Sequence, residues 1–143
     1  MSDSKQKNSV EKLLAEATRH FQSGQHQEAL SLCIQAESIS PKNIDICKKK
    51  LACAHAMGSK SEMLDYSLQL SELTPKDSRL WKTIAFISQE LKRYPEAALA
   101  FKQYQALTKP TMPLLIMQAS NLIKAKAYQE AIDVYKKAEK LFP

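Results

Sequence analysis

The stretch 80–101, LWKTIAFISQELKRYPEAALAF, decides the fold of this chain. Its apolar residues recur three and four positions apart, beginning at Trp81 and again at Ala97, and this is the pattern of two amphipathic helices. The pattern predicts helices over about 78–91 and 94–107, joined by a short turn. A single pair of this kind cannot bury its apolar face alone, so we expect several pairs to stack.

The same register recurs every 34 residues along the chain. Four residues of types that favour a helix N-cap share this spacing: Ser9, Asn43, Asp77 and Thr111. Three further rows keep it: Leu13, Cys47, Trp81 and Leu115; Ala29, Met63, Ala97 and Ala131; and Glu28, Glu62, Glu96 and Glu130. The rows predict one domain of four repeats, 10–43, 44–77, 78–111 and 112–143, after a flexible polar tail at 1–9.

This pattern resembles the tetratricopeptide repeat, a 34-residue helix–turn–helix unit. The third repeat matches it best, with Trp81, Ile84, Ala85, Tyr94, Ala97 and Phe101 at the signature positions. The first repeat has Cys33 where the family favours an aromatic residue. The resemblance implies an all-α, right-handed solenoid of about eight helices in antiparallel pairs, elongated, with a concave and a convex face. It also implies that Trp81 is buried between the helices of its pair.

Composition sets further limits. The chain has 143 residues, of which 44% are hydrophobic, and this is enough for one domain with a core. No apolar run approaches the length of a membrane span and the start is polar, so we expect a cytoplasmic protein that does not contact membranes. Three cysteines, at 33, 47 and 53, favour buried thiols over a disulfide framework.

The sequence offers little for catalysis. None of His20, His26 and His55 is spaced from Cys or a carboxylate as metal ligands are, and we interpret His20 and His26 as packing residues. Two isolated glycines cannot form a glycine-rich phosphate loop. We therefore expect no enzyme activity, no metal and no cofactor.

The charge points to the kind of partner. The formal net charge is +6, and residues 78–143 supply all of it because 1–77 contain equal numbers of basic and acidic residues. This excess favours an acidic partner segment, although a solvated helix surface explains it equally well. Nucleic acid is disfavoured, because the basic residues are scattered and no aromatic platform is interleaved with them.

The family resemblance implies that the first helix of each pair lines a concave groove that binds a peptide or helix of a partner protein. We name the following twelve residues the predicted groove: Leu14, Thr18, Phe21, Lys48, Lys49, Ala52, Arg79, Lys82, Phe86, Met117, Ser120 and Lys124. Phe21 and Phe86 are its candidate aromatic anchors. The alternative for Phe86 and Met117 is that they pack between adjacent repeats. The positions of the family's carboxylate clamp for chaperone tails lack both asparagines, so we expect a different ligand.

Two functions stay open at this stage. The first is a non-catalytic interaction module with a scaffold or adaptor role. The alternative is the N-terminal recruitment domain of a larger enzyme, such as a transferase, whose catalytic part lies beyond residue 143. The last predicted helix, about 128–141, carries Ile132, Tyr135 and Leu141 with no following repeat to cover them. We expect either further residues to cover this face or two copies to associate through it.

Overall fold

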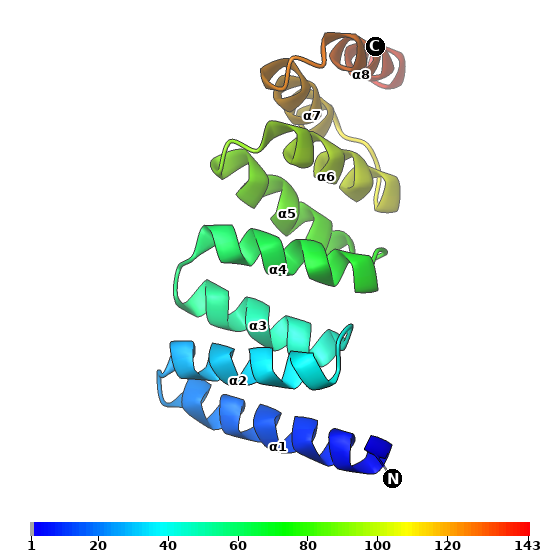
Figure 1. The fold of residues 1–143 in the computed structure, drawn as a ribbon. Helices are drawn as coiled ribbons and strands as arrows, with labels where there is room; N and C mark the ends of the chain where they lie inside the picture. The colour runs from blue at the N-terminus through cyan, green and yellow to red at the C-terminus, as the bar shows by residue number, and fades with distance from the viewer. Residues whose placement is uncertain (1) are drawn as a thin grey trace. The chain divides into compact units, whose positions relative to one another are not determined.

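The computed structural model describes residues 2–143, and the regular structure in this range is entirely α-helical (Figure 1). Its eight helices are α1 Ser2–Gln22, α2 His26–Ile39, α3 Ile44–Ala56, α4 Lys60–Leu73, α5 Ser78–Glu90, α6 Tyr94–Leu107, α7 Met112–Lys124 and α8 Tyr128–Leu141. The chain divides into two compact units, 1–73 with α1–α4 and 74–143 with α5–α8, which we call unit 1 and unit 2 and describe separately. The all-α prediction is confirmed.

The predicted N-caps are correct at three of four positions. The side-chain oxygens of Asn43, Asp77 and Thr111 accept hydrogen bonds from backbone N–H groups in the first turns of α3, α5 and α7. For Asn43 the donor is the N–H of Ile46, at 3.2 Å. Each cap satisfies a donor that would otherwise lack a partner, and this fixes where the first helix of a pair begins.

The prediction for the fourth cap, Ser9, is wrong. Ser9 lies inside α1, which continues back to Ser2, so residues 2–9 are helical where a polar tail was expected. The side chains of residues 3–9 are exposed, and Val10 is the first buried residue of the helix. These turns therefore extend the helix without adding to the core.

Each turn inside a pair contains one residue with a left-handed backbone. Gly24 and Gly58 have φ of 80° and 70°, and the later repeats place Lys92 and Lys126 at the same point with φ of 60° and 63°. Glycine adopts this left-handed conformation at no steric cost, whereas a lysine there is strained. Lys42, with φ of 62°, adopts it in the turn after α2, which the sequence pattern did not indicate.

Small residues allow consecutive helices of each unit to pack closely. Ala29, Ala97 and Ala131, from one of the predicted rows, are almost fully buried in α2, α6 and α8. The three cysteines are free and buried, as expected of core thiols. Cys33 and Cys53 belong to the core of unit 1, which also includes Val10, Ala17, Leu30 and Ile46.

Trp81 departs from its prediction. Its side chain is only half-buried, and its indole Nε1–H donates to the carbonyl of Pro75 at 2.8 Å. The ring therefore ties α5 to the segment that precedes it, where the sequence predicted a fully buried ring between paired helices. A half-buried aromatic contributes less to stability than the full core burial that the prediction assumed.

A polar pair occupies the same place in the register of each unit. In unit 1 the ammonium of Lys50 on α3, 2% exposed, lies 2.6 Å from Glu37 Oε2 on α2. In unit 2 Gln105 Nε2 on α6 donates to Gln118 Oε1 on α7 at 3.0 Å. The members of the second pair follow those of the first by two repeats of 34 residues. An ion pair and an amide pair thus serve one structural position.

Candidate functional site

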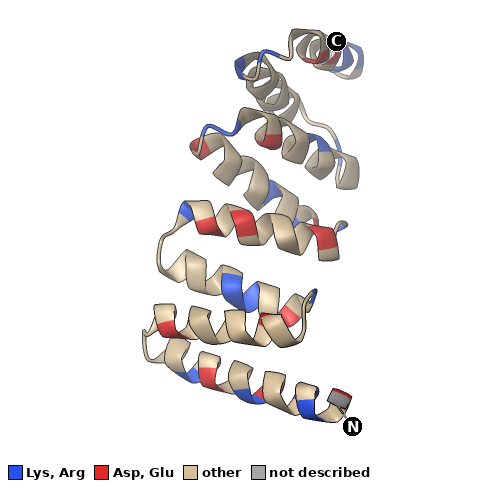
Figure 2. Cartoon of the chain, viewed as in Figure 1, with Lys and Arg blue, Asp and Glu red and all other residues tan. Residues whose placement is uncertain are grey.

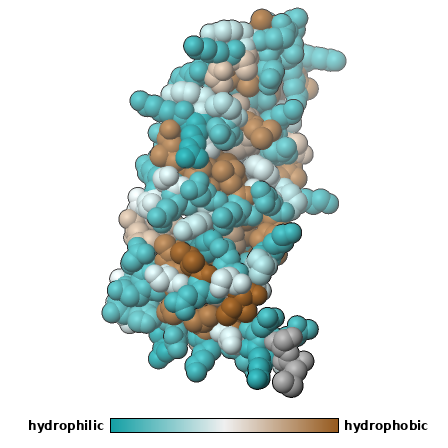
Figure 3. Space-filling view, in the orientation of Figure 1, coloured by the Kyte–Doolittle hydropathy of each residue, from teal (hydrophilic) through white to brown (hydrophobic). Residues whose placement is uncertain are grey.

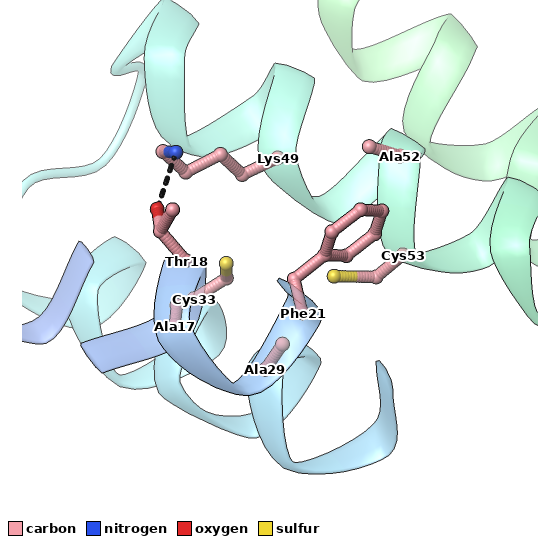
Figure 4. Close-up of a pocket in the computed structure, with 8 residues that line it drawn as sticks. All are labelled: Ala17, Thr18, Phe21, Ala29, Cys33, Lys49, Ala52 and Cys53. Carbon is pink, nitrogen blue, oxygen red and sulfur yellow. Dashed lines mark hydrogen bonds between the residues drawn. The ribbon is translucent and has the colours of Figure 1, made fainter. Parts of the chain in front are cut away.

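A pocket of about 160 Å³ opens among α1, α2 and α3 of unit 1 (Figure 4). We call it the Cys33 pocket, and its eight lining residues are Ala17, Thr18, Phe21, Ala29, Cys33, Lys49, Ala52 and Cys53. Four of these, Thr18, Phe21, Lys49 and Ala52, belong to the predicted groove. The structure therefore brings one third of the predicted groove together around a single hollow.

The polar end of the pocket is held by a short chain of hydrogen bonds. Lys49 Nζ donates to Thr18 Oγ1 at 2.9 Å, and the Thr18 hydroxyl donates to the carbonyl of Leu14 at 2.9 Å. In Figure 4 the lysine extends from α3 toward the threonine on α1. The ammonium is thus positioned at the pocket by a neutral partner and keeps its full positive charge for a ligand.

The apolar end is formed by Phe21, whose ring lies apart from the Lys49–Thr18 contact (Figure 4). The Phe21 ring packs edge-on against His26, with centroids 4.8 Å apart. This contact agrees with the packing role predicted for His26, and it fixes one wall of the pocket.

Two thiols complete the lining, and neither is suited to nucleophilic chemistry. Burial raises the pKa of Cys33 to about 11, and the nearby Cys53 adds to this effect. Burial also raises the pKa of Cys53. Because the thiolate is the reactive form of cysteine, both groups act as small apolar wall residues at neutral pH.

The basic side chains of the predicted groove have no acidic partners within residues 2–143. No ion pair joins Lys48, Lys49, Arg79, Lys82 or Lys124 to a carboxylate in this range. Figure 2 shows basic residues on α3 and acidic ones along α4 of unit 1. The groove cations are therefore available to an incoming negative charge.

The other two predicted residues of unit 1 lie outside the Cys33 pocket. Leu14 is half-buried against the core of unit 1 and lines a different hollow, next to Val10 and Asp45. Lys48 is exposed on α3. On the face of unit 1 seen in Figure 3, apolar patches are interleaved with hydrophilic side chains.

In unit 2 the predicted residues lie on α5 and α7. Arg79 and Lys82 are exposed, and Ser120 is half-buried. Lys124 is also exposed, and its Nζ lies 5.2 Å from the centroid of the Tyr94 ring, within the range of a cation–π contact.

The two apolar candidates of unit 2 serve packing. Phe86 is half-buried and meets the buried ring of Phe101 edge-on, with centroids 5.4 Å apart. Met117 is half-buried, and its carbonyl accepts a hydrogen bond from Asn121 Nδ2 at 2.8 Å. Phe86 and Phe101 lie on the paired helices of one repeat, and Met117 and Asn121 lie on one helix. Packing of Phe86 and Met117 between adjacent repeats therefore stays a prediction.

Sequence reasoning missed four residues of the Cys33 pocket: Ala17, Ala29, Cys33 and Cys53. These residues lie on the helix faces that pack against neighbouring helices, and the predicted groove was taken from the opposite faces. The one available signal was Cys33, a small residue where the family pattern favours an aromatic ring.

A second, wider hollow of about 820 Å³ lies among α6, α7 and α8 of unit 2. Its lining includes Leu99, Lys102, Leu122, Glu130, Val134 and Lys137. The predicted groove lies on first helices alone and does not include this hollow. Charges of both signs line this hollow, so it has no preference for a charged ligand as clear as that of the Cys33 pocket.

Within residues 2–143, no group of three or more His, Cys, Asp or Glu side chains could hold a metal ion. No helix in this range is long and apolar enough to cross a bilayer.

The fold is a tetratricopeptide-like helical repeat, and solved structures of MamA match it over most of the length of the chain. MamA of AMB-1 matches with a TM-score of 0.66 and 17% identity over 92% of this chain and 72% of that one. MamA of MSR-1 gives 0.60 and 18% over 92% and 76%. MamA from Desulfovibrio magneticus RS-1 gives 0.58 and 13% over 92% and 75%. At such identities the likeness concerns the fold alone. No family model and no curated protein matches the chain.

Proposed function

We propose that this protein is a non-catalytic interaction module that binds an acidic segment of a partner protein on the first helices of its repeats. In unit 1 the contact surface is the Cys33 pocket, and unit 2 has a contact surface of its own at the exposed basic side chains Arg79 and Lys82. The observation that carries the proposal is the unpaired Lys49 ammonium, held against neutral Thr18 at the mouth of an apolar pocket.

Electrostatics explains why an acidic partner is favoured. A cation without a carboxylate neighbour gains attraction from an incoming Asp or Glu and breaks no existing ion pair to do so. Each exposed contact of this kind contributes less than about 1 kcal/mol, so the cations provide selection and the pocket provides affinity.

The proposal is tested by panning a random dodecapeptide display library against the full chain. We expect the selected peptides to be enriched in Asp and Glu over Lys and Arg, and their binding to weaken as salt rises, because exposed charges are screened over about 8–10 Å at physiological ionic strength. A library that yields no binders, or binders without acidic enrichment, would contradict the proposal.

Charge reversal supplies the matched control. The double variant Lys49→Glu, Lys82→Glu places acidic groups on the proposed surface and should lose the acidic peptides. The variant Lys60→Glu, Lys140→Glu makes the same change in net charge at exposed positions of α4 and α8, the second helices of their pairs. This control variant should still bind the acidic peptides. Equal losses in both variants would mean that total charge, and not this surface, attracts the peptides.

We also propose that a second copy of the chain is a partner, through the exposed side of α8. Tyr128, Ile132 and Tyr135 on that helix are 57%, 46% and 40% exposed. Ile132 occupies the register position of Ala98 in the previous repeat, and Ala98 is buried in a cluster with Leu115 and Ala119 of α7. A position covered by a helix in one repeat is therefore uncovered in the next, and pairing of two α8 faces would cover it.

A further inference from the structure

The Cys33 pocket has a counterpart in unit 2 at the same register positions, and there the space is filled. Two repeats of 34 residues separate Cys33 from Phe101 and Thr18 from Phe86. The two phenylalanine rings meet edge-on with centroids 5.4 Å apart, and Phe101 is 1% exposed. Where unit 2 has two packed rings, unit 1 has a thiol and a hydroxyl.

The other lining positions do not all differ in this direction, because Phe21 brings a ring into unit 1 where unit 2 has an amide. Phe21 and Cys53 of the pocket correspond to Gln89 and Asn121, whose side chains form a hydrogen bond of 2.8 Å that joins α5 to α7. No such bond spans the Phe21 and Cys53 positions, since neither side chain carries an amide. Ala17 and Ala29 correspond to Ala85 and Ala97, so the small floor residues are shared. The helix arrangement is therefore the same in both units, and unit 1 lacks the ring that Phe101 supplies in unit 2.

The size of the pocket agrees with the missing group. Its volume is about 160 Å³. An apolar cavity of roughly 150 Å³ in another protein binds benzene. A phenyl ring thus fits both by volume and by the example of Phe101 within this chain.

We propose that the Cys33 pocket receives a phenylalanine side chain from the acidic partner segment, with a neighbouring carboxylate of that segment on Lys49. The inserted ring takes the role that Phe101 has in unit 2. Phe21 and the two thiols supply its apolar surroundings, and the Lys49 ammonium at the pocket mouth pairs with the carboxylate. This inference rests on the proposed function and specifies its ligand: an acidic segment with one aromatic anchor.

The first experiment tests the pocket without any peptide. Fluorobenzene is titrated into the full chain and observed by ¹⁹F NMR, with ¹H–¹⁵N spectra to locate the shifts. We expect saturable binding that perturbs the backbone amides of Ala17, Cys33 and Cys53. Cys33→Phe, which copies unit 2, should abolish it, whereas Cys33→Ala should retain it. Absence of saturable binding to the unaltered protein would overturn the proposal.

A second variant covers the case in which Cys33→Phe does not fold. Ala52 lines the pocket but is exposed, so Ala52→Leu should narrow the mouth without disturbing the core. It should weaken fluorobenzene binding in a protein whose circular dichroism is unchanged. Unchanged binding in Ala52→Leu would place the probe elsewhere and overturn the proposal.

The second experiment uses two peptides of equal charge, one with a central Phe between Glu residues and one with Ala in its place. Burying a phenyl ring should tighten binding by about tenfold or more, so the Ala peptide should bind at least that much more weakly. Lys49→Gln should weaken both peptides more than it weakens fluorobenzene binding, because fluorobenzene is uncharged and gains nothing from the ammonium. Equal binding of the two peptides would overturn the anchor and leave the charge-selective function standing. Fluorobenzene binding without any peptide binding would overturn the proposed function.

Discussion

The turn between paired helices needs one residue with a left-handed backbone, and this requirement can be tested at Gly58. A Cβ added there would have no atom within 4 Å, so a substitution changes backbone strain and chain entropy without a clash. We expect Gly58→Ala to lower the free energy of unfolding by about 1 kcal/mol, measured by urea denaturation. Gly58→Asn should cost clearly less, since asparagine tolerates this conformation. Equal costs for the two variants would show that strain at this residue is not the cause.

The buried thiols give the protein a predictable response to alkaline pH. Cys33 has a pKa of about 11 in the folded protein, against an ordinary value of 9.0, so the folded state keeps its proton over a range in which the unfolded chain loses it. The contribution of the Cys33 thiol to the free energy of unfolding is fully present below pH 9 and is lost as the pH rises from 9 toward 11. Unfolding curves across this range should fall less steeply for Cys33→Ala. The same slope in both proteins would contradict a raised pKa.

At the scale of helices, the polar pairs are expected to be interchangeable. Glu37→Ala removes the half-exposed counter-charge of the Lys50 ammonium, which keeps its contacts with Gln69 and the Tyr66 ring, and should lower the free energy of unfolding by about 1–2 kcal/mol. The double variant Glu37→Gln, Lys50→Gln copies the Gln105–Gln118 pair of unit 2 and should be clearly more stable than Glu37→Ala. Chemical denaturation measures both. A double variant no more stable than Glu37→Ala would mean that the two pairs are not equivalent.

The N-caps were predictable because each depends on the type of one residue and its place in the register. Asn43, Asp77 and Thr111 illustrate this. Ser9 has the right type and spacing, yet α1 continues through it back to Ser2. The position of Trp81 also escaped prediction, because a hydrogen bond to Pro75 competes with burial and no periodic pattern encodes that competition.

The candidate site was predictable only in part. The resemblance selected the helix faces, and Thr18, Phe21, Lys49 and Ala52 do gather there. The depth of the Cys33 pocket was not predictable, because it depends on which packed side chains are too small to fill the space between the helices. Cys33 marks the pocket only through comparison with Phe101, and Lys50 marks the polar pair only through comparison with Gln118. Both residues look like ordinary sequence variation between repeats until the structure shows which side chains are in contact.

At the scale of the whole molecule, the exposed side of α8 predicts self-association. Sedimentation velocity over a concentration series should show reversible dimer formation by the isolated chain. Tyr135→Glu should weaken it by placing a charge in the apolar face. Lys136→Glu, an adjacent exposed position, changes charge without removing apolar area and should have a much smaller effect. A chain that stays monomeric at all concentrations would refute pairing through this helix.

The central claim is that unit 1 binds an acidic partner segment at the Cys33 pocket. The most direct test is a ¹H–¹⁵N NMR titration of the full chain with the acidic peptide that carries a central Phe. The account predicts that the largest shift changes fall on Thr18, Phe21, Lys49 and Cys53 and saturate together. Shift changes that instead gather around Leu99, Leu122 and Val134, in the hollow among α6, α7 and α8, would contradict it.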